Sequence, residues 1–239
     1  MQHELETLKR YISESNYIVF FGGAGVSTES GIPDFRSVDG LYSQKYKYPP
    51  ETIVSRTFFM NNTSEYFEFH RARLLHLDAK PNAAHIKLAE LEKMGKLKAI
   101  ITQNIDGLHQ AASSENVFEL HGSLKHNLCM DCGTDHDVSI IKDSTGIPYC
   151  DCGGIIKPDI VLFEEPLNDW VIDESLRHIS KADMLIIGGT SLAVYPAAAL
   201  IHYYSGNKLV LINKSETHVD SRADLLIHGS IGEALNAAI

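Results

Sequence analysis

Short apolar runs recur along the chain, and polar or amphipathic stretches separate them. Each run is only four to six residues long and consists mainly of apolar side chains, which is typical of a strand buried on both faces of a parallel sheet. The pattern predicts five such strands: Tyr17–Phe21, Leu97–Thr102, Ala182–Ile187, Leu209–Ile212 and Leu225–His228.

Helical periodicity lies between several of these runs and is clearest from Asn82 to Met94. This segment begins just after Pro81 and ends at Gly95, a residue suited to a helix C-terminal cap. Its apolar residues recur near helical spacing, at Ala84, Leu88, Leu91 and Met94. Strands that alternate with helices predict an α/β fold with a doubly wound parallel sheet.

Two segments interrupt the alternation of strands and helices. Residues 37–80 are rich in Tyr and Phe and contain helical stretches, whereas residues 124–157 contain all four cysteines. No Gly/Ser/Pro-rich linker separates either segment from its neighbours. We therefore expect the two insertions to build one smaller domain that packs against the sheet.

Small and polar residues follow the predicted strands, at residues 22–28, 103–106, 188–191 and 213. In a doubly wound sheet, ligands bind beyond the carboxyl ends of the strands. The first of these segments offers Gly23-x-Gly25 with the hydroxyls of Ser27 and Thr28, groups that can approach a phosphate. Because the dinucleotide fingerprint is only partly met, a simple strand-to-helix turn remains open for this loop.

The composition is that of an ordinary globular protein, with 239 residues, 44% hydrophobic and 22% charged, and a net charge of −10. This charge gives no basic field for nucleic acid or an anionic membrane, so we expect neither partner. No apolar run approaches the length of a membrane span, and the N-terminal MQHELETLKRY does not resemble a signal peptide. We expect a cytoplasmic protein.

The four cysteines, Cys129, Cys132, Cys150 and Cys152, form two close pairs in a chain that is otherwise free of thiols. This arrangement favours a closed, structural zinc site, with two disulfides or unpaired thiols as alternatives. The second pair is C-x-C where a zinc ribbon usually has C-x2-C, and Gly153 and Gly154 would let that turn form. The alternative ligands are His126, His136 and Asp151.

Three further polar residues lie at strand ends. His121 follows the strand-like Val117–Leu120, and a histidine there can act as a general base because its pKa lies near working pH. Asn104 and Asp106 could orient a polar ligand or water, although an Asx turn that caps the next helix explains them equally well.

Six blocks, in order along almost the whole chain, resemble the sirtuin family, and its compact bacterial members in particular. They are GAGVSTESGIPDFRS (23–37), TQNIDGLHQ (102–110), ELHGS (119–123), KPDIVLFEE (157–165), GTSLAVYPAA (189–198) and LINKSE (211–216). The resemblance implies an NAD-dependent protein-lysine deacetylase or deacylase with a Rossmann-like sheet and a smaller inserted helical and zinc-ribbon domain. The large domain would be residues 1–36, 81–123 and 158–239, and the small domain 37–80 and 124–157.

The resemblance also implies roles for individual residues. His121 would be the general base and Asn104 a second catalytic residue, while Val161, Phe163 and Val194 would bind the acyl-lysine peptide. The four cysteines would hold one structural Zn²⁺. NAD would be bound by Ala24, Thr28, Phe35, Arg36, Gln103, Ile105, Asp106, His121, Thr190, Ser191, Asn213 and Ile231.

In the implied reaction, nicotinamide leaves NAD, and the products are free lysine and an O-acyl-ADP-ribose. The rival activity on the same fold is NAD-dependent ADP-ribosyl transfer or NAD glycohydrolysis. A nucleic-acid- or protein-binding zinc ribbon and a hydride-transferring dehydrogenase are further alternatives. The net charge disfavours nucleic acid, and the incomplete fingerprint disfavours the dehydrogenase.

The chain departs from the family pattern at three places. Gly22 precedes the GAG motif where many relatives have threonine, the second cysteine pair is one residue short, and Glu164 replaces the glycine of a usual Phe-Gly-Glu. The Tyr-x-x-Arg motif of sirtuins that prefer succinyl-lysine is also missing, because Phe69 comes three residues after Tyr66. We therefore expect a preference for neutral acyl groups.

Overall fold

The computed structural model describes residues 2–37, 40–43 and 46–239. Its main sheet has six parallel strands in the order β3-β2-β1-β7-β8-β9. These strands are β1 (Ile18–Gly22), β2 (Leu97–Thr102), β3 (Val117–Glu119), β7 (Met184–Gly188), β8 (Leu209–Asn213) and β9 (Leu225–His228). The doubly wound α/β fold expected from the apolar runs is thus confirmed.

The five predicted strands lie within two residues of the observed ones. The largest difference is at β7, which begins at Met184 rather than Ala182 because Ala182 still caps the helix before it. The next residue, Asp183, uses its carboxylate to accept hydrogen bonds from the backbone N–H groups of Asn16 and Tyr17. The sixth strand, β3, is the strand-like segment before His121, and it forms the edge beside β2.

Successive residues of the central strand β1 pack into two different cores, one on each face of the sheet. Ile18 and Phe20 pack with α1 (Gln2–Glu14), α5 (Ala83–Lys93) and α9 (Ile231–Ala238). Val19 and Phe21 pack with α8 (Asp169–Lys181) and the 3₁₀ helix η4 (Ala197–Tyr203). Burial on both faces explains why these strands are apolar throughout instead of alternating.

Helix α5 lies one residue inside each predicted end. Asn82 caps it through a hydrogen bond from the N–H of Ala84, and the N–H of Asn82 in turn donates to Nδ1 of His85. Gly95 follows the helix with φ of +73°, as a C-terminal cap requires. Met94 is 61% exposed and therefore lies outside the apolar face.

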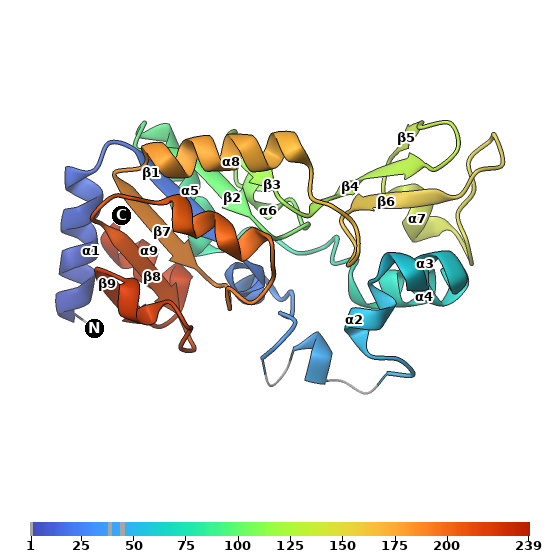
Figure 1. Cartoon of the computed structure of the whole chain (residues 1–239), viewed down its shortest axis with the longest axis horizontal. Helices are drawn as coiled ribbons and strands as arrows, with labels where there is room; N and C mark the ends of the chain where they lie inside the picture. The colour runs from blue at the N-terminus through green and yellow to red at the C-terminus, as the bar shows by residue number, and fades with distance from the viewer. Residues whose placement is uncertain (1, 38–39, 44–45) are drawn as a thin grey trace.

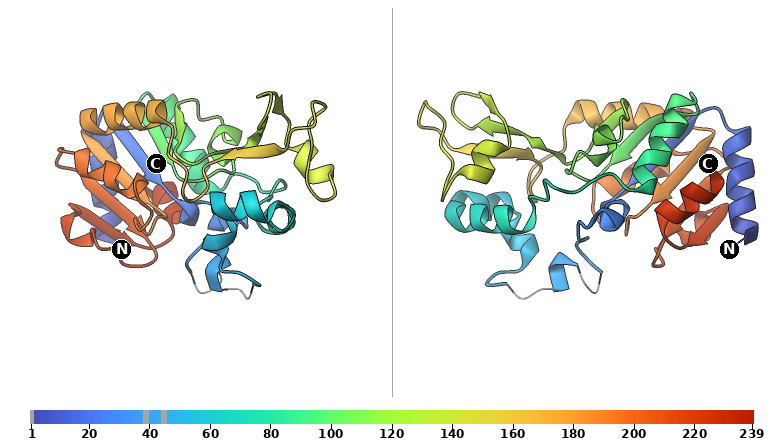
Figure 2. Two further views of the ribbon diagram at one scale, coloured as in Figure 1. Left: turned by 45° about the vertical axis from the view of Figure 1, so that its right-hand side comes forward. Right: turned by 180° about the vertical axis from the view of Figure 1, so that it is seen from behind.

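The two insertions form a second body beside the main sheet (Figures 1 and 2). The first contributes α2 (Pro50–Ile53), α3 (Arg56–Asn61) and α4 (Thr63–Arg73). The second contributes α7 (Ser139–Asp143) and the antiparallel strands β4 (Gly122–Cys129), β5 (Asp135–His136) and β6 (Ile156–Ile160), of which β4 and β6 extend two and three residues beyond the predicted insertion 124–157. A third apolar core joins them, with Phe59 and Phe67 from the helices beside Leu124 and Ile156 from the strands.

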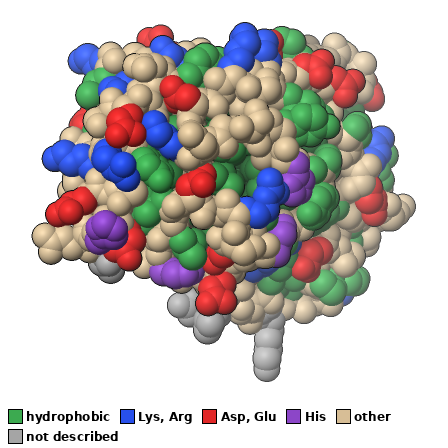
Figure 3. All heavy atoms as spheres, turned by 60° about the vertical axis from the view of Figure 1, so that its left-hand side comes forward, with side chains coloured by type: hydrophobic (Ala, Val, Ile, Leu, Met, Phe, Trp, Pro, Cys, Tyr) green, Lys and Arg blue, Asp and Glu red, His purple; other side chains and the backbone are tan. Residues whose placement is uncertain are grey.

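Short helices follow several strands and complete the described structure: η1 (Ala24–Val26), η2 (Thr28–Ser30), η3 (Leu41–Ser43), α6 (Leu108–Ala111) and η5 (Asp220–Arg222). Within the described ranges, we find no helix that is long and apolar enough to cross a membrane. On the face shown in Figure 3, Lys and Arg side chains are interspersed with Asp and Glu.

Candidate functional site

A cavity of about 860 Å³ lies between the carboxyl ends of the main strands and the second body. Its walls include the loops after β1 and β2, the segment between α4 and α5, the residues just after β3, the segment after β6 and the residues just before η4. The predicted site residues on these walls are Ala24, Phe35, Arg36, Gln103, Asn104, Ile105, Asp106, His121, Val161, Phe163 and Val194. Residues far apart in the chain therefore meet at one opening.

A hydroxyl joins the two candidate polar residues of the β2 loop. Ser27 Oγ donates to Asp106 Oδ2 at 2.6 Å, and Asn104 Nδ2 donates to Ser27 Oγ at 3.0 Å. The other carboxylate oxygen of Asp106 accepts from the backbone N–H of Leu108 at 2.9 Å. Asp106 therefore serves both alternatives left open by the sequence. Its Oδ1 forms the Asx turn with Leu108, and its Oδ2 is held by Ser27 at the cavity wall.

The sequence indicates Ser27 only as a hydroxyl of the first loop that can approach a phosphate, and it does not predict the contact with Asp106. Its role depends on a contact with a residue 79 positions away in the chain, which no local pattern contains. Arg73, Lys125 and Asp137 of the second body also line the cavity, and no motif in the sequence distinguishes them from other surface charges.

His121 lines the cavity with its imidazole orientation determined by the backbone. Its Nδ1 lies 2.9 Å from the carbonyl oxygen of Gln103. Because a carbonyl oxygen only accepts, Nδ1 carries the proton and the lone pair is on Nε2. Burial lowers the pKa of His121 below the ordinary value of 6.5, and the hydrogen bond to Gln103 partly opposes this shift. The ring is thus neutral at pH 7 and able to accept a proton.

A tyrosine supports the Phe35–Arg36 segment at the cavity wall. The Tyr42 ring packs edge-on against Phe35 with 5.6 Å between ring centroids, and the Arg36 guanidinium lies 5.4 Å from the centroid of the same ring. The backbone N–H of Tyr42 also donates to the carbonyl oxygen of Phe35. These contacts hold an aromatic and a cationic side chain next to one another at the opening.

The remaining predicted NAD residues, Thr28, Thr190, Ser191, Asn213 and Ile231, are not part of the walls of this cavity. Asn213 and Thr190 hold the ends of β8 and β7 together, because the Asn213 side chain accepts from the N–H of Thr190 and donates to its carbonyl oxygen. Gln103 Nε2 then donates to Thr190 Oγ1 at 3.1 Å, which links this group to the cavity wall. Ile231 is buried against the sheet, and Ser191 is exposed.

The loops after β1 and β7 touch through their backbones. Gly25 N–H donates to the carbonyl oxygen of Gly189 at 2.7 Å, and Gly189 has φ of +59°. A Cβ at Gly189 would lie 2.4 Å from the backbone nitrogen of Val26, so no larger residue fits there. A Cβ at Gly25 of the first loop would in turn lie 2.8 Å from the Cα of Gly189, so this close approach requires glycine at both positions.

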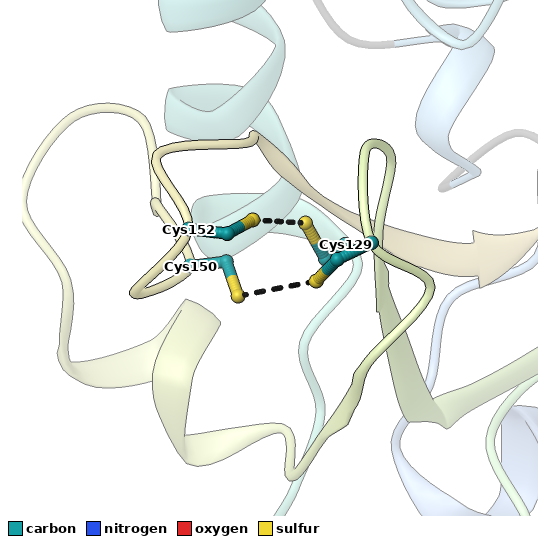
Figure 4. Close-up of side chains that lie close together, drawn as sticks. Cys129, Cys150 and Cys152 are labelled. Carbon is teal, nitrogen blue, oxygen red and sulfur yellow. Dashed lines mark hydrogen bonds between the residues drawn. The ribbon is translucent and has the colours of Figure 1, made fainter.

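The four cysteines come together in the second body. Figure 4 shows Cys129, Cys150 and Cys152 of this group with their sulfur atoms directed toward a common centre. All four sulfur atoms lie within 4.8 Å of one another, with Cys129 Sγ 3.4 Å from Cys152 Sγ and Cys132 Sγ 3.7 Å from Cys150 Sγ. These distances are too long for disulfides and close to the separation of about 3.8 Å expected for thiolates around a tetrahedral zinc ion with Zn–S bonds of about 2.3 Å. The donor set therefore fits zinc.

Glycine explains how the short C-x-C pair reaches the same geometry as the C-x2-C pair. Gly153 has φ of +91°, and a Cβ at Gly154 would lie 2.7 Å from Cys129 Sγ. The alternative ligands His126, His136 and Asp151 do not belong to the group of four, and His126 instead pairs with Asp135 at 2.7 Å.

Residues 23–196 match the model of the Sir2 family. The chain is 60% identical over 240 residues to an NAD-dependent protein deacetylase of Clostridium acetobutylicum, covering 99% of this chain and 98% of that protein.

Solved structures agree with this match. The fold superposes with a TM-score of 0.91 and 38% identity on a Sir2 protein with deacetylated p53 peptide and 3′-O-acetyl ADP ribose, covering 98% of this chain and 96% of that one. A Sir2 complex with p53 peptide and NAD⁺ gives a TM-score of 0.87 and 39% identity, covering 97% and 95%.

Proposed function

Because this chain belongs to the Sir2 family, we propose that it is an NAD-dependent protein deacetylase, which cleaves nicotinamide from NAD and transfers the acyl group of an acyl-lysine to the ADP-ribose. The observation that carries this function is that His121 and the Ser27–Asp106–Asn104 group line one cavity. The cytoplasmic location stays a prediction.

NAD and the acyl-lysine peptide would bind where the main sheet and the second body meet. We assign the large domain to residues 1–36, 81–123 and 158–239 and the small domain to 37–80 and 124–157. NAD would extend from the cavity, lined by Ala24, Phe35, Arg36 and Gln103, toward the ends of β7 and β8, where Thr190, Ser191 and Asn213 lie. Thr28 would contact the phosphates, and Ile231 the adenosine half. The acyl-lysine would enter beside Val161, Phe163 and Val194.

The reaction needs few charged groups. Nicotinamide leaves a cationic linkage as a neutral molecule, so the site must bury it and bind its amide, tasks that suit Ile105 and Asp106. The acyl oxygen then attacks the ribose carbon, and His121 Nε2 removes a proton from a ribose hydroxyl that attacks the resulting alkylamidate. The tetrahedral adduct then expels the lysine amine, and addition of one water molecule to the remaining cyclic cation gives O-acetyl-ADP-ribose. Asn104 would orient the ribose or a water molecule in this sequence.

Zinc would be held by the four thiolates and would supply folding energy to the small domain. None of the four cysteines lines the cavity, so the metal is a structural group. The reaction would proceed on the protein's own side chains.

Product analysis tests the proposed function against its rival. The protein would be incubated with NAD and an acetyl-lysine peptide, and the products identified by mass spectrometry. O-acetyl-ADP-ribose in equal amount to deacetylated peptide is expected. Free or protein-bound ADP-ribose without acetyl transfer would instead support NAD glycohydrolysis or ADP-ribosyl transfer.

Replacing Asp106 by Asn should weaken inhibition by free nicotinamide and lower the deacetylation rate, each by about tenfold, because a charged hydrogen-bond partner of the amide is lost. Inhibition curves at fixed NAD measure the effect. Asp137→Asn is the control, since Asp137 also lines the cavity but belongs to the second body. Unchanged nicotinamide sensitivity in Asp106→Asn would remove Asp106 from the nicotinamide pocket.

Acetyl-lysine should be preferred over succinyl-lysine by at least about tenfold in kcat/KM, because an unpaired carboxylate in an apolar tunnel costs several kcal/mol. Tyr66, the first residue of the missing motif, is fully buried, and its hydroxyl lies 3.4 Å from His70 Nδ1. Arg73 does line the cavity. The two acyl groups would be compared on one peptide.

Arg73→Ala is the matched variant for this comparison. It should leave the low succinyl rate unchanged, since no tyrosine of the motif accompanies Arg73 on the cavity wall. Comparable acetyl and succinyl rates in the native protein, with the succinyl rate lost in Arg73→Ala, would contradict the prediction.

A further inference from the structure

A second cavity, of about 470 Å³, adjoins the first across the segment Phe163–Glu164. These two residues line both cavities, so the smaller cavity lies beside the one that would take the acyl-lysine. The other walls of the second cavity come from α2, from α3 and from the residues just before and after α3: Glu51, Thr52, Ser55, Thr57, Phe58, Asn61 and Asn62.

The walls of this second cavity combine apolar surface, to which Phe58 and Phe163 contribute, with acidic and polar side chains. Glu51 and Glu164 contribute carboxylates, and the remaining polar residues contribute amides and hydroxyls. Among the described residues on these walls, none is Lys, Arg or His. The nearby Arg56 directs its guanidinium to Glu165, with NH1 3.3 Å from Oε1. Such a lining favours a cation and disfavours an anion.

Glu164 is held in one position by the start of α3. Its Oε2 accepts from the backbone N–H of Thr57 at 2.8 Å and from Thr57 Oγ1 at 2.6 Å, which leaves Oε1 available to another donor. These bonds lower the pKa of Glu164 below 4.5, so the side chain is ionised at neutral pH. Its φ of +76° is unusual for a residue with a side chain, and the Thr57 contacts help to maintain it.

The wall that carries Glu164 is fixed by backbone hydrogen bonds as well. Phe163 N–H donates to the carbonyl oxygen of Val54, and Arg56 N–H donates to the carbonyl oxygen of Phe163, both at 3.0 Å. On the other side, Glu165 Oε2 accepts from the N–H of Leu162 and from Lys157 Nζ. The carboxylate of Glu164 is therefore preorganised, and little entropy would be lost when a ligand pairs with it.

We infer that the second cavity is a subsite for a basic side chain of the substrate protein, and that Glu164 is the residue that determines this specificity. The inference rests on the proposed function, because it needs an acyl-lysine peptide in the adjoining cavity. A lysine or arginine close to the acyl-lysine would reach between Glu51 and Glu164, whereas an acidic residue would be repelled there.

Matched acetyl-lysine peptides test this subsite. They would differ only at one flanking position at a time, with Lys, Gln or Glu placed within three residues of the acetyl-lysine on either side. We expect one position at which Lys exceeds Gln by about threefold to tenfold in kcat/KM, and Gln exceeds Glu, since each partly exposed ion pair contributes modestly. Raising the salt concentration should reduce the preference.

Glu164→Gln should bring the Lys-to-Gln ratio in kcat/KM close to one. The amide oxygen of Gln can still accept hydrogen bonds from Thr57, so this variant removes the negative charge but keeps the hydrogen bonds that hold the loop. Glu68→Gln is the matched control, because Glu68 is exposed on α4 and lines neither cavity. Glu51→Gln provides a second variant should Glu164→Gln fold poorly, and it should lower the ratio in the same direction.

The possible outcomes distinguish failure of the proposed subsite from failure of the proposed deacetylase function. If no acetyl peptide is deacetylated in the presence of NAD, the proposed function fails. If the peptides are deacetylated but show no preference for Lys, or keep that preference unchanged in both Glu164→Gln and Glu51→Gln, the function stands and the subsite is overturned.

Discussion

Replacing His121 by Ala should lower the rate of deacetylation by about 100- to 10,000-fold while NAD still binds, because loss of a general base typically has an effect of this size. The structure identifies the atom concerned. Nδ1 donates to the carbonyl oxygen of Gln103, so Nε2 is the nitrogen with a lone pair at the cavity. Alanine removes that lone pair and leaves the Ser27–Asp106 contact in place.

The pH dependence follows from the same environment. Burial lowers the pKa of His121 below 6.5, and the base acts only in its neutral form. The rate should therefore be steady near neutral pH and fall as the pH is lowered through the folded pKa, below 6.5. In His121→Ala the small residual rate should lack this acidic decline.

Calorimetric titration with NAD and single-turnover deacetylation measure the two parts of the prediction. His3→Ala is a suitable control, since His3 is exposed on α1 and no function is assigned to it. Full activity in a folded His121→Ala protein would show that another group removes the proton.

Removing zinc, or replacing Cys129 by Ser, should unfold the small domain and abolish activity. A closed four-thiolate site contributes an apparent binding free energy on the order of 10 kcal/mol to folding, comparable to the whole stability of a domain. Cys129 is 3% exposed, and Cys150 packs against the third core. The loss would therefore spread from the thiolates to α4 and β6, which help to build that core.

Metal analysis of the purified protein should give close to one zinc per chain. Treatment with a strong chelator should lower the melting temperature and the activity together, and added zinc should restore both. Asp151→Asn is the matched variant for Cys129→Ser, because Asp151 lies between two of the cysteines but is outside the group of sulfurs. An active, zinc-free protein that resists chelators would contradict the structural role of the metal.

Local patterns in the sequence determined much of the fold. The apolar runs predicted five of the six strands within two residues, because burial on both faces favours apolar side chains at most positions. Asn82 and Gly95 indicated the ends of α5, because capping involves only neighbouring backbone groups. The spacing of the cysteines predicted the zinc site because the two sulfurs of each pair are brought together by one short turn, which depends only on neighbouring residues.

Tertiary structure alone decided which of these parts meet. The strand order β3-β2-β1-β7-β8-β9 brings the loops after β1 and β2 together, so that Ser27 reaches Asp106, and those after β7 and β8, so that Thr190 reaches Asn213. The position of Glu164 likewise could not be predicted from local sequence, because its hydrogen bonds to Thr57 depend on packing between segments 107 residues apart. Periodicity reports the burial of each segment, whereas long-range partners depend on how the buried faces pack together.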